Sequence, residues 1–538
     1  MIGYHGRTGT REGTPALSWE GPASAIAYGD GDARTCLERL DEPCFVVRNG
    51  HGTGVTSVGA ASTSGLPLLA TGPALSRRSL GDPAFLSTYG LDAAYVGGSM
   101  ANGISGEEMV IALGRAGMLG AFGAGGCTPA RLSAAIDRVQ EALPDGPYAF
   151  NLIHAPYEPA LERRAVELYL ERGVRVVEAS AYIALTPYLV HYRVAGLSQG
   201  PAGQVQIDNR VIAKVSRREV ATRFMRPAPD KLLGPLVAQG AITQEQAALA
   251  RRVPMADDVT VEADSGGHTD NRPLVCLLPS IQALRDEIQT ELAYETPVRV
   301  GAAGGIGTPI AALGAFMMGA AYIVTGSVNH SCVEAGTSAH VKRLLSEADM
   351  ADVMMAPSAD MFEMGVNVQV LKRGTMFGLR ARKLYEFYQS YESLEAIPGP
   401  ELAKLERQIL KRPVAEVWDG CVAFFNERDL SQIAKARENP KRKMALVFRW
   451  YLGLATRWGT SGEKGRELDY QVWCGPAMGA FNDWVRGSHL EAPENRTVAD
   501  VAGQMMDGAA YLYRVQSLRA QGVQLPSSVL RRRPIRPN

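Results

Sequence analysis

Two glycine-rich turns are the first candidates for chemistry in this sequence. Residues 301–309 read GAAGGIGTP after a short apolar run, and residues 325–327 read TGS after the next such run. Glycines let backbone N–H groups point toward an anion, and a helix that begins after the turn adds partial positive charge. The pair indicates a phosphate site, although each turn alone fits a plain tight turn, and the first lacks the GxGxxG dinucleotide spacing. The residues expected to hold the phosphate are Gly304, Gly305, Gly326 and Ser327.

A histidine follows another glycine pair. His268 comes directly after Gly266 and Gly267, which leave room for the backbone beside a bulky planar ligand. A histidine side chain can donate a proton near pH 7. His268 is therefore a candidate proton donor, and the alternative is a turn histidine that is bonded to a neighbouring backbone group.

A lysine interrupts an apolar run of strand length. Lys214 lies within residues 211–215, which read VIAKV, and a buried ammonium needs an anionic partner. The pyrimidine edge of a reduced flavin gathers negative charge and would supply one. Glu178, at the end of another such run, would supply a plain internal salt bridge instead.

The elements that must position these residues alternate between short apolar runs and helical segments. This pattern predicts βα units, and eight of them close a (β/α)8 barrel, whose active site is built from the loops after the strands. An open doubly wound sheet is the alternative. Gly98 and Asn151 also lie at strand ends. The eight predicted strands are 93–97, 118–122, 148–153, 174–178, 211–215, 259–263, 298–302 and 321–325.

The rest of the chain divides around this barrel, which we place at residues 89–335. Residues 1–88 predict a small β-rich domain, and residues 336–538 predict a helical region. Residues 217–256 are too long for a simple turn, so we expect them to form a lid insertion over the active face. The basic cluster at its start, expected at a substrate entrance, is Arg217, Arg218 and Arg223.

Composition excludes several classes of function. Lys plus Arg and Asp plus Glu both total 56, so no overall charge favours nucleic acid or an anionic membrane. Seven scattered cysteines without a CxxC pair argue against disulfides or a metal site and fit a reducing cytoplasm. Residues 1–13 lack the pattern of a secretory signal. The most membrane-like stretch, 306–324, is better explained as a buried helix and strand.

Taken together, the motifs resemble those of FMN-dependent barrels of the nitronate monooxygenase and enoyl reductase group. More narrowly, residues 85–515 resemble the PfaD family of trans-acting enoyl reductases from polyunsaturated fatty acid and trans-acyltransferase polyketide synthases. Related barrels often read EAGGH where this chain has Asp264 and Ser265 before the glycine pair. The motifs that carry the resemblance are GGSMANG, GAFGAGG, NLIHAPYEPALE, VVEASAYIALTP, AKVS, EADSGGH, AAGGIGTP, TGSVNHSCVEAGTS, APSADMFEMGVNVQVLKRGTMF and YLGLATRWG.

The resemblance implies an enzyme that holds FMN, takes hydride from NADPH and reduces an enoyl thioester on an acyl carrier protein. It implies that Lys214 faces the flavin pyrimidine, that Gly98 and Asn151 lie beside the ring, and that His268 donates a proton to the α-carbon. Two other functions stay open: a nitronate monooxygenase that uses FMN and oxygen, and a non-catalytic assembly subunit of a synthase. Apolar helices at the surface favour a homodimer.

Overall fold

The computed structural model describes residues 2–4, 17–156, 158–426 and 429–536. Most of residues 1–13, where no secretory signal is expected, lie outside this part. At the centre is a closed barrel of eight parallel strands, in the order β10-β13-β14-β16-β17-β7-β8-β9. The predicted barrel is therefore confirmed and the open sheet is not formed. The strands are β7 (Tyr95–Gly97), β8 (Leu119–Phe122), β9 (Ala149–Ile153), β10 (Val176–Ser180), β13 (Arg210–Val215), β14 (Asp258–Glu262), β16 (Arg299–Ala303) and β17 (Ile323–Thr325).

Side chains alternate along each strand between the barrel interior and the helix layer, as the pleat of a strand requires. The lower interior is mainly apolar, as at Ile212, but it also contains the buried ion pair of Asp258 and Arg299. Toward the carboxyl ends of the strands the interior becomes polar, with Glu178 and Lys214 on neighbouring strands. The functional layer therefore sits above a packed interior in which the charged side chains are paired with each other.

Helices cover the outside of the barrel where the helical period predicts them. The predicted helix at 159–172 is α5 (Pro159–Glu171), and that at 273–292 is α10 (Leu274–Leu292). The segment 306–324 forms α11 (Pro309–Met317) and β17, as expected. No helix in the described ranges has both the length and the apolar character needed to cross a membrane. The other outer helices are α3 (Glu107–Arg115), α4 (Pro129–Ala142), α6 (Pro187–Ala195) and α7 (Arg218–Met225).

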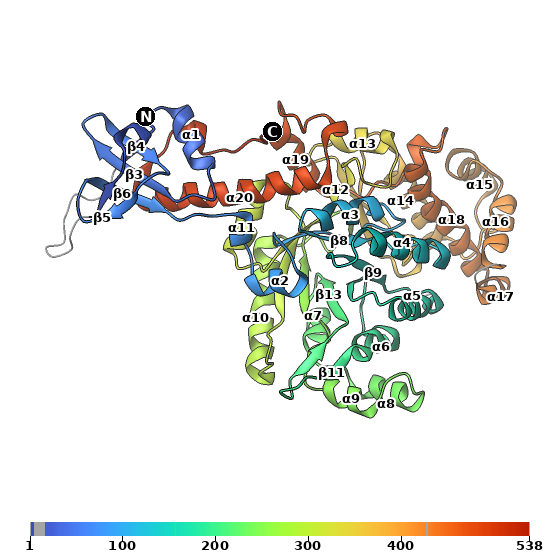
Figure 1. Ribbon diagram of the computed structural model, residues 1–538. Helices are drawn as coiled ribbons and strands as arrows, with labels where there is room; N and C mark the ends of the chain where they lie inside the picture. The colour runs from blue at the N-terminus through green and yellow to red at the C-terminus, as the bar shows by residue number, and fades with distance from the viewer. Residues whose placement is uncertain (1, 5–16, 157, 427–428, 537–538) are drawn as a thin grey trace.

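The segment expected as a lid does not cover the active face. Its first helix, α7, runs back down the barrel wall, and the hairpin of α8 (Asp230–Ala238) and α9 (Gln244–Ala250) packs on α6. Helix α9 also contacts β11 (Leu197–Gln199), which pairs with β12 (Val205–Ile207) immediately before β13 begins. The hairpin therefore lies at the amino-terminal end of the barrel, at the bottom of Figure 1.

The N-terminal region forms a five-stranded sheet in the order β4-β3-β6-β2-β5 together with helix α1 (Asp30–Glu38). The long helix α20 (Val498–Ala520) joins this sheet to the barrel by packing along α11 (Figure 1). Arg514 of α20 is fully buried and donates hydrogen bonds to five backbone carbonyls of residues 37–73. The sheet strands are β2 (Ser18–Glu20), β3 (Cys44–Asn49), β4 (Gly52–Thr56), β5 (Ala60–Ser62) and β6 (Leu66–Gly72).

The region after the barrel is mainly helical, with a hydrophobic core of its own. It also contains a small antiparallel sheet, in which β19 (Asn367–Leu371) lies between β18 (Val353–Pro357) and β15 (Gly267–His268). This sheet connects the loop after β14 to the helical region. The main helices of this region are α14 (Phe377–Ser390), α15 (Gly399–Leu405), α16 (Val414–Asn426), α17 (Leu430–Glu438), α18 (Pro440–Ser461) and α19 (Ala477–Val485).

Candidate active site

A cavity opens at the carboxyl ends of the barrel strands and contains about 680 Å³ of atom-free space, including some open solvent. The predicted site residues that line it are Gly98, Lys214, Gly266, Gly304, Gly305, Gly326 and Ser327. Further lining residues include Ser99, Met100, Glu262, Ser265, Ile306, Trp473, Gly475 and Ala477.

The two glycine turns form one wall of the cavity, and their glycines differ in the space available for a side chain. A Cβ atom on Gly305 or Gly326 would meet no atom within 4 Å, so both face open space. Gly304 has a φ of +86°, and a Cβ there would lie 2.7 Å from the carbonyl carbon of Ala263. Gly304 is therefore required by the fold, whereas Gly305 and Gly326 leave room for a group in the cavity.

Lys214 lies between two carboxylates of neighbouring strands. Its Nζ is 3.6 Å from Glu178 Oε2 and 3.9 Å from Glu262 Oε1. Burial lowers the pKa of Lys214, but the two carboxylates outweigh this effect and hold the pKa above its usual value. Glu178 is 1% exposed and accepts hydrogen bonds from the backbone and hydroxyl of Ser99. The alternative salt bridge is therefore formed, and Lys214 also reaches the cavity.

His268 is paired with side chains of the loop after β18. Its Nε2 is 3.2 Å from Asp360 Oδ1 and 3.4 Å from the hydroxyl of Ser358. Burial opposes the positive charge, but Asp360 raises the pKa of His268 above its usual value. The paired imidazolium in turn holds the pKa of Asp360 well below its usual range, despite burial. His268 is not among the residues that line the cavity.

Two further expectations concern Gly98 and Asn151, which were expected to lie beside a flavin ring. Gly98 lines the cavity, and its N–H donates to the carbonyl of Thr325. Asn151 does not line it, because its amide donates to the carbonyl of Glu178 and to the hydroxyl of Ser180. Gly267, with a φ of +84°, forms the turn before His268 and also lies outside the lining.

The three arginines of the expected entrance are already bound to partners. Arg217, at the rim, makes a bidentate pair with Asp270 at 2.9 and 2.8 Å. On α7, Arg218 bonds to Glu287 of α10, and Arg223 bonds to the carbonyl of Ile183. None of the three lines the cavity, and only Arg217 belongs to the loop directly after a barrel strand.

Sequence analysis did not identify the wall that residues 473–477 contribute. Gly475 donates its N–H to the hydroxyl of Ser327, and Trp473 lines the cavity beside it. A Cβ on Gly475 would lie 2.8 Å from the Gly266 nitrogen, and a Cβ on Gly266 would lie 2.8 Å from the Cys474 nitrogen. Two loops that are about 210 residues apart in sequence thus touch backbone to backbone. The glycines at these two positions were the one feature of the sequence that could have indicated this contact.

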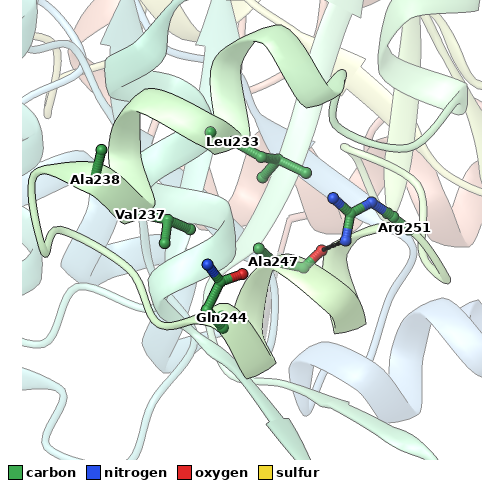
Figure 2. Close-up of a pocket in the computed structure, with 7 residues that line it drawn as sticks. Leu233, Val237, Ala238, Gln244, Ala247 and Arg251 are labelled. Atoms are coloured by element: carbon green, nitrogen blue, oxygen red, sulfur yellow. Dashed lines mark hydrogen bonds between the residues drawn. The ribbon is translucent and has the colours of Figure 1, made fainter.

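A second hollow lies in the α8–α9 hairpin, at the opposite end of the barrel. It is lined mainly by apolar side chains such as Leu233, Val237 and Ala247 (Figure 2). Its one charged side chain, Arg251, is paired with Asp230 and also bonds to a backbone carbonyl. This hollow offers no group for the chemistry expected at the strand ends.

Three family models match the chain. The nitronate monooxygenase model matches residues 90–381, which is more than half of the chain. The model described as the fatty acid synthase subunit PfaD N-terminal domain matches residues 19–74. Residues 391–470 match the inserted helical domain of [acyl-carrier-protein] S-malonyltransferase, which sequence analysis did not identify.

Known proteins are similar over most of the chain. One of the polyunsaturated fatty acid synthase subunits of Thraustochytrium sp. is 49% identical over 93% of this chain and 34% of that protein. Polyketide biosynthesis protein PksE from Bacillus subtilis is 45% identical over 82% of this chain and 58% of that protein. The chain thus spans about a third of the first relative and less than two thirds of the second.

A solved structure matches along its whole length. It is the enoyl reductase domain of MlnA from the macrolactin biosynthesis cluster of Bacillus amyloliquefaciens, with 39% identity and a TM-score of 0.79. The match covers 83% of this chain and 100% of that domain. The resemblance drawn from the motifs is therefore confirmed: the chain belongs to the nitronate monooxygenase family and is a PfaD-like member of it.

Proposed function

We propose that this protein is an FMN-dependent enoyl reductase that takes hydride from NADPH. Its substrate would be an α,β-unsaturated acyl thioester on an acyl carrier protein, in polyunsaturated fatty acid or polyketide synthesis. The observation that carries the proposal is the cavity in which the glycine turns and Lys214 meet at the mouth of a closed barrel. The similarity to the enoyl reductase domain of MlnA and to proteins of fatty acid and polyketide synthases supports it.

The side chains of the cavity fit FMN. Gly305 and Gly326 face open space where backbone N–H groups would meet a phosphate. Among the described residues, no hydrogen-bond partner is found for two buried polar atoms, the Ser265 hydroxyl and Glu178 Oε1. Because buried polar atoms normally find partners, these two atoms are suited to the polar edge of a bound ring. Lys214 adds a cation that a flavin favours near its pyrimidine edge.

When bound, the flavin supplies the hydride that adds to the β-carbon of the thioester. The protein binds and orients the reactants and excludes water. Gly305 and Gly326 hold the phosphate, and Lys214, kept cationic by its two carboxylates, places positive charge at the polar end of the cavity. Trp473 and Gly475 form a wall beside Ser327 and limit the access of water.

Anaerobic stopped-flow spectroscopy tests the proposal. We expect NADPH to bleach the flavin absorbance of the purified protein and a crotonyl thioester to restore it. Restoration only by oxygen, together with oxygen uptake on addition of an alkyl nitronate, would instead establish a nitronate monooxygenase. A colourless protein that binds no added FMN would establish a non-catalytic role in synthase assembly.

The carrier protein is the proposed partner, and the match of residues 391–470 to a domain of an acyl-carrier-protein transferase supports it. Carrier proteins are usually acidic, and Arg217 is a 60% exposed cation at the rim. We expect R217E to slow turnover of the carrier-linked thioester but not of a small crotonyl thioester. R226E is the matched control, because Arg226 pairs with Glu291 at the other end of the barrel. Equal rates for R217E and R226E would contradict this role.

A cytoplasmic location and a homodimer complete the proposal. A cytoplasmic enzyme would keep its seven cysteines reduced. Light scattering of the purified protein tests the dimer, with a single species of twice the chain mass as the expected result.

A further inference from the structure

Three charged side chains meet at the polar end of the barrel interior, and they differ in access to the cavity. Lys214 and Glu262 line the cavity, whereas Glu178 lies behind them and is 1% exposed. Glu178 Oε2 is taken by Ser99. Glu262 is therefore the carboxyl group of this cluster that lines the cavity.

His268 has the opposite arrangement. Its Nε2 is occupied by Asp360 and Ser358, and its side chain does not line the cavity. The Asp360 partner favours the charged imidazolium and opposes its loss of a proton. The preceding glycine pair, the chemistry of imidazole and the family resemblance made His268 the expected donor, but its placement favours another acid.

The surroundings of Glu262 raise the pKa of its carboxyl group. Burial raises the pKa of Glu262, and the positive charge of Lys214 offsets only part of this rise. Glu178 raises it further and His268 lowers it, so the groups that face Glu262 are these three. Lys214 Nζ lies 3.6 Å from Glu178 and 3.9 Å from Glu262, so one ammonium is shared by two carboxyl groups and offsets only part of the effect of burial on Glu262.

We propose that Glu262, rather than His268, is the acid that protonates the α-carbon of the acyl thioester. This inference rests on the proposed function. As the hydride adds to the β-carbon, the O–H bond of the Glu262 carboxyl group breaks and a C–H bond forms at the α-carbon. The electron pair of the O–H bond stays on the carboxylate, which lies beside Lys214 and regains a proton from water. The overall reaction consumes one NADPH and one proton for each double bond.

Single-turnover reoxidation of the NADPH-reduced protein tests the inference. E262Q cannot donate the proton, so we expect crotonyl-thioester reoxidation to slow by about 100-fold or more. E262D keeps an acid at shorter reach and should be about tenfold slower than wild type, while H268Q should stay within about threefold. Ferricyanide takes electrons without protonating carbon, so its reduction should be equal in all variants.

Two readouts do not depend on activity. FMN should bind E262Q with a Kd within about twofold of wild type, which shows an intact cavity. The infrared spectrum of wild type at neutral pH should contain the carbonyl band of a protonated carboxylic acid that is missing in E262Q. The reoxidation rate of wild type should fall at high pH as Glu262 loses its proton, and E262Q should lose this dependence.

The outcomes separate this inference from the proposed function. If wild type does not reoxidise with the thioester at all, the proposed function fails. If wild type reoxidises and E262Q matches it while H268Q is about 100-fold slower, the proposed function stands and the role of Glu262 is refuted. Absence of the infrared difference between wild type and E262Q would also refute it.

Discussion

A single methyl group in the phosphate cup should separate cofactor binding from folding. Gly326 lines the cavity, its φ is −128°, and a Cβ there would meet no protein atom within 4 Å. G326A therefore introduces no backbone strain of the left-handed kind and no clash. We expect the free energy of unfolding of the apoprotein to change by less than about 0.5 kcal/mol.

The same methyl group would occupy space that we assign to the FMN phosphate. The loss of one hydrogen bond to a charged group costs about 1.5–3 kcal/mol. Since 1.4 kcal/mol corresponds to a factor of ten, the Kd for FMN should rise by about 10- to 150-fold. The effect on affinity would thus exceed the effect on stability several-fold.

Fluorescence titration of the apoprotein with FMN and urea unfolding measure the two quantities. G314A is a matched control, because Gly314 of α11 also has no atom within 4 Å of its Cβ position but lies outside the cavity lining. G304A is the converse case, since its φ of +86° and the contact with Ala263 should cost about 1–3 kcal/mol of stability. A well-folded G326A that binds FMN like wild type and G314A would refute the phosphate cup.

Three further predictions concern the surroundings of the site. D360N removes an ion pair in which the pKa of Asp360 is lowered and that of His268 is raised. The melting temperature should therefore drop most between about pH 4 and 6.5, and less at higher pH, where His268 loses its proton and the wild-type pair is lost. A drop that does not depend on pH would contradict this prediction. G475A forces a methyl group to within 2.8 Å of the Gly266 nitrogen. Urea unfolding should therefore show a loss of about 1–3 kcal/mol in the free energy of unfolding, and FMN should bind more weakly. A variant with unchanged stability and FMN affinity would disprove the contact. R514M leaves buried carbonyls without donors, so the free energy of unfolding should fall by about 3 kcal/mol. Limited proteolysis should then cut the N-terminal sheet first. R519M is the control, because Arg519 lies on the exposed side of α20, and it should behave like wild type.

The barrel could be predicted because its information is local. Each strand is a short apolar run, and helices such as α5 begin at a proline in the first turn. The glycine turns and Lys214 could be assigned to the site because the strand ends of a barrel converge, whatever the exact packing. The fold and the place of the candidate site could therefore be predicted from short local motifs.

Other features depend on contacts between distant parts of the chain. The α8–α9 pattern indicates a packed hairpin but not the end of the barrel on which it packs, and the contact with α6 decides this. Asn151 is a polar residue at a strand end, yet its side-chain amide donates a hydrogen bond to the backbone of β10. The cavity wall at Trp473 belongs to a segment about 150 residues beyond the last barrel strand. The residues around Trp473 alone therefore do not indicate that this segment reaches the barrel.

The central claim is that FMN lies at the mouth of the barrel with its phosphate between the two glycine turns. A crystal structure of the protein purified with FMN tests it most directly. We predict the phosphorus atom within hydrogen-bonding range of the backbone at Gly305 and Gly326, and the ring beside Lys214 and Trp473. A flavin bound elsewhere, or a cavity that stays free of flavin at saturating FMN, would contradict the account.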